Sequence, residues 1–276
     1  MMLQDHPKIS IIMPSFNQGR YLAAAIRSVL SQDYPNKELI LIDGGSTDQS
    51  VEIIRQYQSD LAYSVSEPDR GQAHALNKGM THATGDIIGW LNSDDCYVPG
   101  AFNRVVAAFH QNPDAILVHG DRIMIDSNGH VSGWTTLPAF DPATTGYIVA
   151  SDTTFWKKSC CDNLHFDENL RFAMDLDYFS RLYHIGRFVK LDSYLGAFRC
   201  HFESKSATIQ SVGDVEGKAR WQDIFPQFPD GWRNEPKYDK KKHLFRFFQH
   251  PFLIAFPYLY RRFCLGLRGM PAGAPR

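Results

Sequence analysis

The chain has 276 residues, of which 43% are hydrophobic and 21% charged, with a formal net charge of −1. These values are typical of soluble globular proteins. The chain is long enough and apolar enough to bury a sizeable core. The charge is unevenly distributed, because residues 237–276 hold nine Lys or Arg and one acid, which gives +8, and residues 1–236 therefore carry −9. We call residues 237–276 the basic tail and expect it to have its own partner.

The cysteines and the amino terminus indicate a cytoplasmic protein. The five cysteines are an odd number and have neither CxxC nor Cys/His metal spacing. Reduced thiols are the plain interpretation. Residues 1–8 contain no apolar stretch like that of a signal peptide.

Strand and helix patterns alternate from residue 8 to residue 110. Strands are expected over residues 8–13, 38–42, 63–65 and 86–91, and helices over residues 21–32, 49–57, 72–80 and 99–110. This alternation predicts a parallel sheet in an α/β layer structure. A further strand is expected over 116–125, beyond which the pattern is mixed.

The four predicted strands of this first part all end in polar residues. The ends are Pro14-Ser15-Phe16-Asn17, Asp43-Gly44-Gly45-Ser46, Glu67-Pro68-Asp69-Arg70-Gly71 and Asn92-Ser93-Asp94-Asp95. Polar loops are common in proteins. Open α/β sheets, however, bind ligands at the edge formed by the carboxyl ends of their strands, and three of these four ends bring carboxylates to that edge. Converging carboxylates repel unless a cation joins them, and Mg²⁺ or Mn²⁺ prefers oxygen ligands and bridges carboxylate to phosphate.

The common phosphate-binding loops are missing. No GxGxxG follows the first strand, and the chain has no GxxxxGK[ST], which argues against a dinucleotide Rossmann site and a P-loop. A diphosphate would then be neutralised by metal and by cationic side chains. Arg70 and Lys78 are the candidates, although Lys78 is equally well explained as a solvated surface residue.

The strand ends, taken with Ser28-Val29-Leu30-Ser31-Gln32 and Asn77-Lys78-Gly79, resemble the nucleotide-binding half of glycosyltransferase family 2. The order and spacing match along roughly residues 8–206. The resemblance implies the GT-A fold, a Rossmann-like, mostly parallel sheet flanked by helices, and sugar transfer from a nucleotide-sugar with inversion. It also implies a GT-A domain over residues 1–210, with a nucleotide-sugar half over 1–115 and an acceptor half over 116–210. Residues 211–276 would form a C-terminal extension.

The resemblance also implies residue roles in the nucleotide half. Four residues would line the nucleoside, Asp43 would hydrogen-bond the base, and Asp94 and Asp95 would form the acidic metal motif beneath the diphosphate. The lining residues are Pro14, Ser15, Phe16 and Asn17. The family motif usually begins with Asp where Asn92 stands, so Asn92 is expected to act more weakly or through water.

In the acceptor half, inversion needs a carboxylate opposite the leaving diphosphate. The segment from Phe172 to Leu182 resembles the family's acceptor-side segment, with Met174 in place of the usual Glu. We therefore expect Asp175 to be the base, with Asp177 as the alternative. Residues two apart on a helix face different ways, so the two cannot both point into the site. An acid that complements the helix dipole is the competing explanation for either.

Further assignments follow from the same resemblance. His201 lies in a segment like the family's closing Arg-x-His-x-x-Ser-x-Ser element, and neutral imidazole also binds Mn²⁺. His201 would complete the metal shell or touch the diphosphate, or be a buried, hydrogen-bonded histidine. Arg199 or Lys205 would add positive charge, and Arg199 is also assigned to the sugar and acceptor pocket. Asp152, Thr153 and Trp156 stand where the family shapes the sugar and acceptor pocket, though Trp156 is equally explained as core.

The basic tail holds an aromatic and apolar stretch, residues 244–260, between basic clusters. With Arg246, His250, Pro251 and Pro257 it falls short of a membrane-spanning helix. It fits an anchor on an anionic membrane surface, which would make the protein peripheral at the inner face of the membrane, or a helical pair packed on the domain. Nucleic acid is a poorer partner because the main domain is acidic.

The sequence thus predicts a metal-dependent inverting glycosyltransferase. The donor would be a UDP-sugar, and the acceptor a hydroxyl of a glycan or a lipid-linked glycan of the cell envelope. Two alternatives remain: a sugar-nucleotide pyrophosphorylase, which should carry a glycine-rich loop after the first strand, and a non-catalytic nucleotide-sugar or glycan-binding module, which Met174 and Asn92 keep open.

Overall fold

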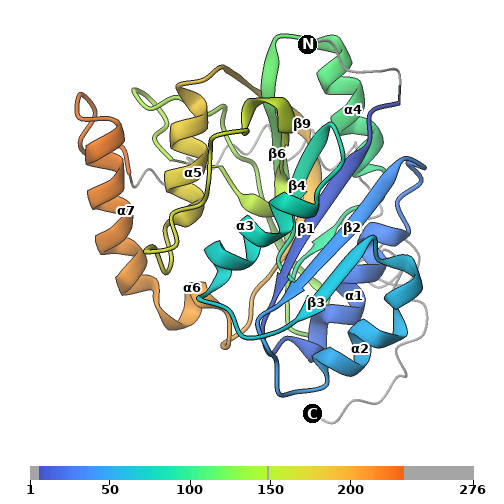
Figure 1. Cartoon of the computed structure of the whole chain (residues 1–276). Helices are drawn as coiled ribbons and strands as arrows, with labels where there is room; N and C mark the ends of the chain where they lie inside the picture. Colours follow the sequence, from blue (N-terminus) through green and yellow to red (C-terminus); the bar gives the residue numbers. More distant parts are fainter. Residues whose placement is uncertain (1–5, 148, 233–276) are drawn as a thin grey trace.

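The computed structural model describes residues 6–147 and 149–232, and the basic tail lies outside them. The first part alternates strands and helices along the chain (Figure 1). Its elements are β1 (Ile9–Ser15), α1 (Gly19–Leu30), β2 (Lys37–Asp43), α2 (Ser50–Gln56), β3 (Tyr63–Ser66), α3 (Gln72–His82), β4 (Ile87–Trp90), β5 (Cys96–Tyr97) and α4 (Ala101–Gln111). Each expected strand and helix of this part is confirmed, with ends that differ by a few residues.

The second part is less regular. Its elements are β6 (Ala115–Ile125), β7 (Val131–Thr135), the short 3₁₀ turn η2 (Ser151–Thr153), β8 (Thr154–Lys157), α5 (Met174–Tyr183), β9 (Arg187–Arg199), α6 (Lys205–Thr208) and α7 (Gln210–Ile224). The strand expected over 116–125 is confirmed as β6.

All nine strands of the described residues form one sheet, in the order β3-β2-β1-β4-β8-β6-β9-β5, with β7 added to β6. The pairs from β3 to β4 are parallel, as predicted. Past β4 the sheet becomes mixed, because β8 runs antiparallel to both β4 and β6 while β6 and β9 are parallel. The carboxyl ends of β1, β2, β3 and β4 therefore lie at one edge, where the polar turns begin.

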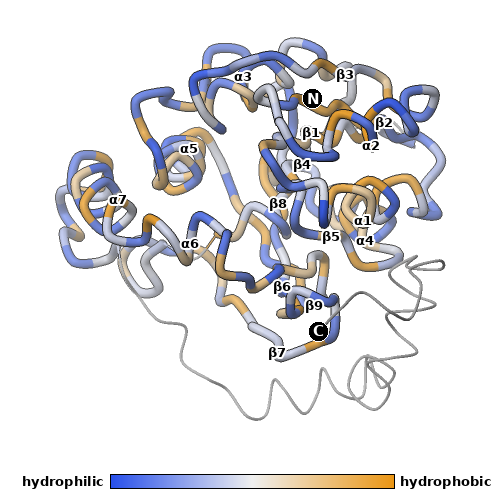
Figure 2. Tube along the Cα trace, turned by 90° about the horizontal axis from the view of Figure 1, so that it is seen from below, coloured by the Kyte–Doolittle hydropathy of each residue, from blue (hydrophilic) through white to orange (hydrophobic). Residues whose placement is uncertain are grey.

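Helices cover both faces of the sheet, which explains why β1 and β4 are buried along their whole length. Ile11 of β1 packs with α1 and α4 in one core, whereas Ile12 packs with α3, α5 and α7 in the other. Figure 2 shows α1 and α4 next to each other on one side of the sheet, and α5 and α7 on the other.

Residues 210–232 belong to the second core. Trp221 and Phe225 of this segment are 0% and 1% exposed and pack with residues of α5. None of the helices within residues 6–232 is long and apolar enough to cross a membrane.

Candidate active site

The turn after β2 is built around Asp43. This side chain is fully buried. Its Oδ2 accepts hydrogen bonds from the Ser46 backbone N–H at 2.9 Å and from the Ser66 hydroxyl at 2.6 Å, and its Oδ1 accepts one from the Ser46 hydroxyl at 2.5 Å. Asp43 is therefore held as an oriented acceptor at the edge of the sheet.

The turn after β1 is joined to this one through Asn17. Asn17 has a φ of 52°, a left-handed conformation that Asn tolerates. Its N–H donates to the Ser46 hydroxyl at 2.7 Å, and its side-chain oxygen accepts from the Thr47 N–H at 2.9 Å. Pro14 and Ser15 are buried at the end of β1, whereas the ring of Phe16 is 60% exposed. An exposed ring at this edge is available to stack on a planar ligand.

The two predicted diphosphate cations are both paired with carboxylates. Arg70 lies 2.5 Å from Glu168, and Lys78 forms an ion pair with Glu67. Each would have to leave its partner to bind a phosphate, so the structure does not add support to these two assignments.

The turn after β4 has Asn92 at its base. The side-chain oxygen of Asn92 accepts from Gln72 Nε2 at 2.7 Å and from Trp90 Nε1 at 2.8 Å. Its amide group faces Asp95 at 3.4 Å. Asn92 thus has acceptor and donor roles inside the protein.

Asp94 and His201 are brought together from distant parts of the chain. Asp94 Oδ2 and His201 Nε2 are 3.0 Å apart, and the imidazole packs on the Tyr21 ring at 4.7 Å between centroids. The His201 side chain is 3% exposed and the Asp94 side chain 16% exposed, and Nδ1 of His201 is buried without a hydrogen-bond partner.

Asp95 points inward instead. It is 1% exposed, and its Oδ1 accepts a hydrogen bond from the Arg199 backbone N–H at 2.8 Å. Burial, together with the neighbouring Asp94 and Asp152 carboxylates, raises the pKa of Asp95 well above its usual value, and the Arg199 N–H opposes this rise.

Arg199 lies beneath the acidic turn, where it is 3% exposed. Its guanidinium donates to the carbonyl oxygens of Asp94 at 2.7 Å and Asp126 at 3.1 Å, and it stacks on Tyr21 at 4.9 Å. These contacts hold the turn in place and do not support the predicted role of Arg199 in the sugar or acceptor pocket.

Within residues 6–147 and 149–232, no group of three or more His, Cys, Asp and Glu side chains is placed to hold a metal alone. Mg²⁺ and Mn²⁺ are often held by one or two protein ligands, with water and substrate phosphates completing the shell. Asp94 Oδ2 and His201 Nε2 face each other at 3.0 Å, so these two atoms fit a metal that is shared with a diphosphate, with the proton of the neutral imidazole on Nδ1.

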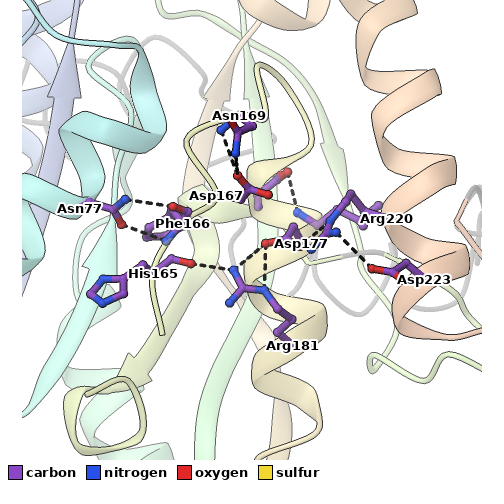
Figure 3. Close-up of polar contacts among 11 residues, drawn as sticks. Asn77, His165, Phe166, Asp167, Asn169, Asp177, Arg181, Arg220 and Asp223 are labelled. Carbon is purple, nitrogen blue, oxygen red and sulfur yellow. Dashed lines mark hydrogen bonds and ion pairs between the residues drawn. The ribbon is translucent and has the colours of Figure 1, made fainter. Parts of the chain in front are cut away.

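Asp175 and Asp177 face different surroundings, as their spacing predicts. Asp177 is fully buried and binds Arg181 at 2.6 Å and Arg220 at 2.5 Å (Figure 3). Both of its oxygens are occupied by these two guanidinium groups. Asp177 is therefore a structural anchor in the described residues, which favours Asp175 of the two carboxylates.

Asp175 is half-buried in the first turn of α5. Burial raises the pKa of its carboxyl above the usual range, while the Leu176 N–H at 2.8 Å and the Tyr147 hydroxyl beside it act in the opposite direction. A raised pKa suits a group that must accept a proton near neutral pH.

The remaining predicted pocket residues lie inside the protein. Trp156 and Thr153 are 0% exposed, and Trp156 packs between Tyr178 and Phe179. Asp152 is 1% exposed and lies 3.3 Å from Arg122, with its Oδ2 unpartnered. Trp156 is core, and Asp152 and Thr153 lie behind the acidic turn.

Gln72 was not expected at this site from the sequence, whereas Lys205 was named there as a possible source of positive charge. The Lys205 ammonium donates to Gln72 Oε1 at 2.7 Å, and Gln72 in turn donates to Asn92. Asp175 acts electrostatically on Lys205. Lys205 and Gln72 thus connect the surroundings of Asp175 to the acidic turn, and only the Ser-Lys-Ser pattern after His201 hinted at the lysine.

Comparisons with known proteins bear on the family and the fold of this chain. The family model described as "Glycosyl transferase family 2" matches residues 10–160. The chain belongs to glycosyl transferase family 2. An uncharacterized glycosyltransferase of Nostoc sp. is 37% identical over 124 residues, which is 44% of this chain and 38% of that protein.

Solved structures of other glycosyltransferases share the fold of this family 2 chain. A fragment of S. aureus TarS in complex with UDP-GlcNAc matches with a TM-score of 0.63 and 18% identity, covering 92% of this chain and 75% of that one. The mannosyltransferase PcManGT from Pyrobaculum calidifontis, in complex with GDP-Man and Mn²⁺, matches with a TM-score of 0.60 and 17% identity, covering 90% and 71%.

The fold is therefore GT-A, as predicted. The matches to the first three curated relatives span between 38% and 55% of the length of those proteins.

Proposed function

We propose that this chain is a divalent-metal-dependent, inverting glycosyltransferase. It moves a sugar from a nucleotide-diphosphate donor, a UDP-sugar, to a hydroxyl of a glycan or lipid-linked acceptor in cell-envelope polysaccharide synthesis. One observation carries the proposal: a continuous set of polar contacts runs from Lys205, beside Asp175, through Gln72 to Asn92 in the acidic turn. A candidate base and a candidate metal motif therefore share one site.

In this proposal the nucleotide lies over the turns after β1 and β2. Phe16 stacks on the base, and Asp43 supplies an oriented acceptor. Asp94 and His201 hold the metal, with Asp95 and Arg199 behind them fixing the turn. Bound there, Mg²⁺ or Mn²⁺ would supply positive charge to the leaving diphosphate.

Asp175 takes the proton of the acceptor hydroxyl, whose oxygen then forms a bond to the anomeric carbon as the bond to the diphosphate breaks. One such displacement inverts that centre. Lys205 adds positive charge next to this carboxylate and to the diphosphate.

We further propose that the enzyme is cytoplasmic and works at the inner face of a membrane, where a lipid-linked acceptor would be found. The basic tail, outside the described residues, is the proposed membrane contact, and no role with nucleic acid is proposed.

The two alternatives are less well supported. The turn after β1 holds Phe16 and Asn17 and no glycine-rich loop, unlike the loop expected of a sugar-nucleotide pyrophosphorylase. A non-catalytic binding module would have no need for a carboxyl with a raised pKa near a half-buried lysine whose pKa is lowered.

Asp175→Asn and Asp94→Asn test the proposal. Asp175→Asn should keep metal-dependent UDP affinity yet lose sugar transfer by about 10²-fold or more, because general-base help is removed. Asp94→Asn should instead weaken UDP binding in Mn²⁺ and leave the weak binding in EDTA unchanged. A thermal-shift screen first identifies the nucleotide-sugars that bind. Titration calorimetry then measures UDP affinity, and a transfer assay measures sugar transfer.

If Asp175→Asn transfers sugar at the rate of the parent protein, Asp175 is not the base. Absence of donor hydrolysis and transfer with every nucleotide-sugar that binds would favour the non-catalytic module.

A further inference from the structure

Helix α7 lies beyond the segment that the family model matches, and it packs against α5. Two polar contacts join the helices at the amino-terminal end of α5, on either side of Asp175. They come from Glu216 and Arg220 of α7, which are four residues apart and therefore share one face of that helix.

Glu216 binds the backbone that leads into α5. Its carboxylate accepts hydrogen bonds from the N–H groups of Arg171 at 2.9 Å, Phe172 at 2.8 Å and Ala173 at 3.0 Å. Ala173 is the N-cap residue of α5, and it makes no side-chain capping hydrogen bond. Burial would raise the pKa of Glu216, but the three N–H donors bring it below the usual value. Glu216 thus supplies from another helix the side-chain cap that Ala173 cannot provide.

Arg220 binds the next turn. Its Nε and Nη2 donate to Asp177 Oδ1 at 2.8 and 2.5 Å, and Arg181 of α5 binds the other oxygen of the same carboxylate (Figure 3). Asp177 has no exposed surface, so loss of Arg220 would leave one buried oxygen of this carboxylate without the hydrogen bonds that Arg220 donates to it.

A small residue lets α7 approach this closely. A Cβ atom at Gly213 would lie 2.2 Å from Cδ1 of Phe172, one of the three residues whose N–H groups Glu216 binds. The anchors at Ala173 and Asp177 therefore bracket Asp175, and both come from the same face of α7.

We propose that α7 is a positioning element for the catalytic carboxylate: Glu216 and Arg220 fix the first turn of α5 and so set the direction of Asp175. This inference rests on the role proposed for Asp175, and neither Glu216 nor Arg220 is proposed to touch substrate.

The test uses Glu216→Ala and Arg220→Met in the full chain. Both variants should keep metal-dependent UDP affinity within about twofold, because no donor-binding residue has changed. Both should lower kcat by about tenfold to a hundredfold, since small misplacements of a reacting group have effects of this size. Amide hydrogen exchange should become faster over residues 171–177 in both.

Matched variants separate positioning from general loss of stability. Lys218→Ala, an exposed change on the same helix, should leave kcat and exchange unchanged. Arg220→Lys keeps a cation opposite Asp177 and should recover most of kcat. If Glu216→Ala does not fold, Glu216→Gln decides, because it keeps one acceptor oxygen and should give a kcat between those of Glu216→Ala and the parent.

The outcomes are distinct. Parental kcat in Glu216→Gln and Arg220→Met, together with an inactive Asp175→Asn, would overturn the positioning role and leave the proposed function intact. An active Asp175→Asn would overturn the proposed role of Asp175 itself.

Discussion

At the scale of single residues, Lys205 is the group from which we expect a pH dependence of donor binding. Burial lowers the pKa of its ammonium to about 8, and the nearby Asp175 carboxylate opposes that shift. The charged form is therefore lost as pH rises through about 8, well below the usual range for lysine. A ligand that prefers the charged form must take up a proton above that pH.

We expect UDP affinity in Mg²⁺ to fall by about tenfold between pH 7 and pH 9, the limit for one required proton with a pKa near 8. Lys205→Arg should abolish most of this fall, because guanidinium stays charged. Calorimetry in two buffers of different ionisation enthalpy measures the affinity and the proton uptake. If Lys205→Arg shows the same tenfold fall in UDP affinity, a group other than Lys205 causes the pH dependence.

Single residues also show how far the sequence predicts the site. The polar turns after β1, β2 and β4 were found because their motifs are contiguous. The carboxylate partners of Arg70 and Lys78 were not predicted. Glu168, for example, lies 98 positions from Arg70, and no local pattern joins the two residues. The sequence favoured Asp175 over Asp177 as the base, but it could not show that Arg220, 43 positions away, binds Asp177.

At the scale of elements, β9 crosses closely over the turn that holds Asp152. A Cβ atom at Gly196 of β9 would lie 2.3 Å from the Asp152 carbonyl oxygen and 2.7 Å from its Oδ2. Gly133 of β7 is the opposite case, because a Cβ atom there would meet nothing nearer than 3.9 Å. The two glycines lie in the same sheet, so Gly133 can serve as the control for a substitution at Gly196.

Gly196→Ala should lower the free energy of unfolding by about 1–3 kcal/mol or more, since backbone must move to make room. Gly133→Ala should change it by no more than about 0.5 kcal/mol. Urea unfolding followed by circular dichroism measures both. Equal stability of the two variants would mean that β9 and the Asp152 turn can separate without cost.

Among the elements, periodicity predicted those of residues 9–111 well, because parallel strands alternate with amphipathic helices there. It did not predict β8, whose four residues are all buried and lie antiparallel between β4 and β6. A short, fully buried strand has no polar alternation to reveal it. The inclusion of Trp221 and Phe225 in the core of the domain was likewise invisible to local pattern.

At the scale of the whole molecule, charge is divided between an acidic body and the basic tail. Each Lys or Arg near an anionic bilayer contributes about 1 kcal/mol of attraction, which salt screens. Burial of Phe247, Phe248, Phe252 and Leu253 would add a part that salt does not remove.

The full chain should therefore sediment with phosphatidylserine vesicles, less so at high salt, and a chain truncated after Pro236 should not. Neutral phosphatidylcholine vesicles are the control for charge. Equal recovery of both chains in the supernatant would show that residues 237–276 are not a membrane anchor.

The contacts of Arg199 bear on the order in which parts of the chain fold during synthesis. Its backbone N–H and its guanidinium bind Asp95 and Asp94 across 104 and 105 positions of sequence. A nascent chain therefore exposes its acidic turn long before the strand that secures it has left the ribosome. Contacts this distant in sequence close late and slow folding. Sugar-nucleotide capture should accordingly begin only once β9 and His201 have emerged.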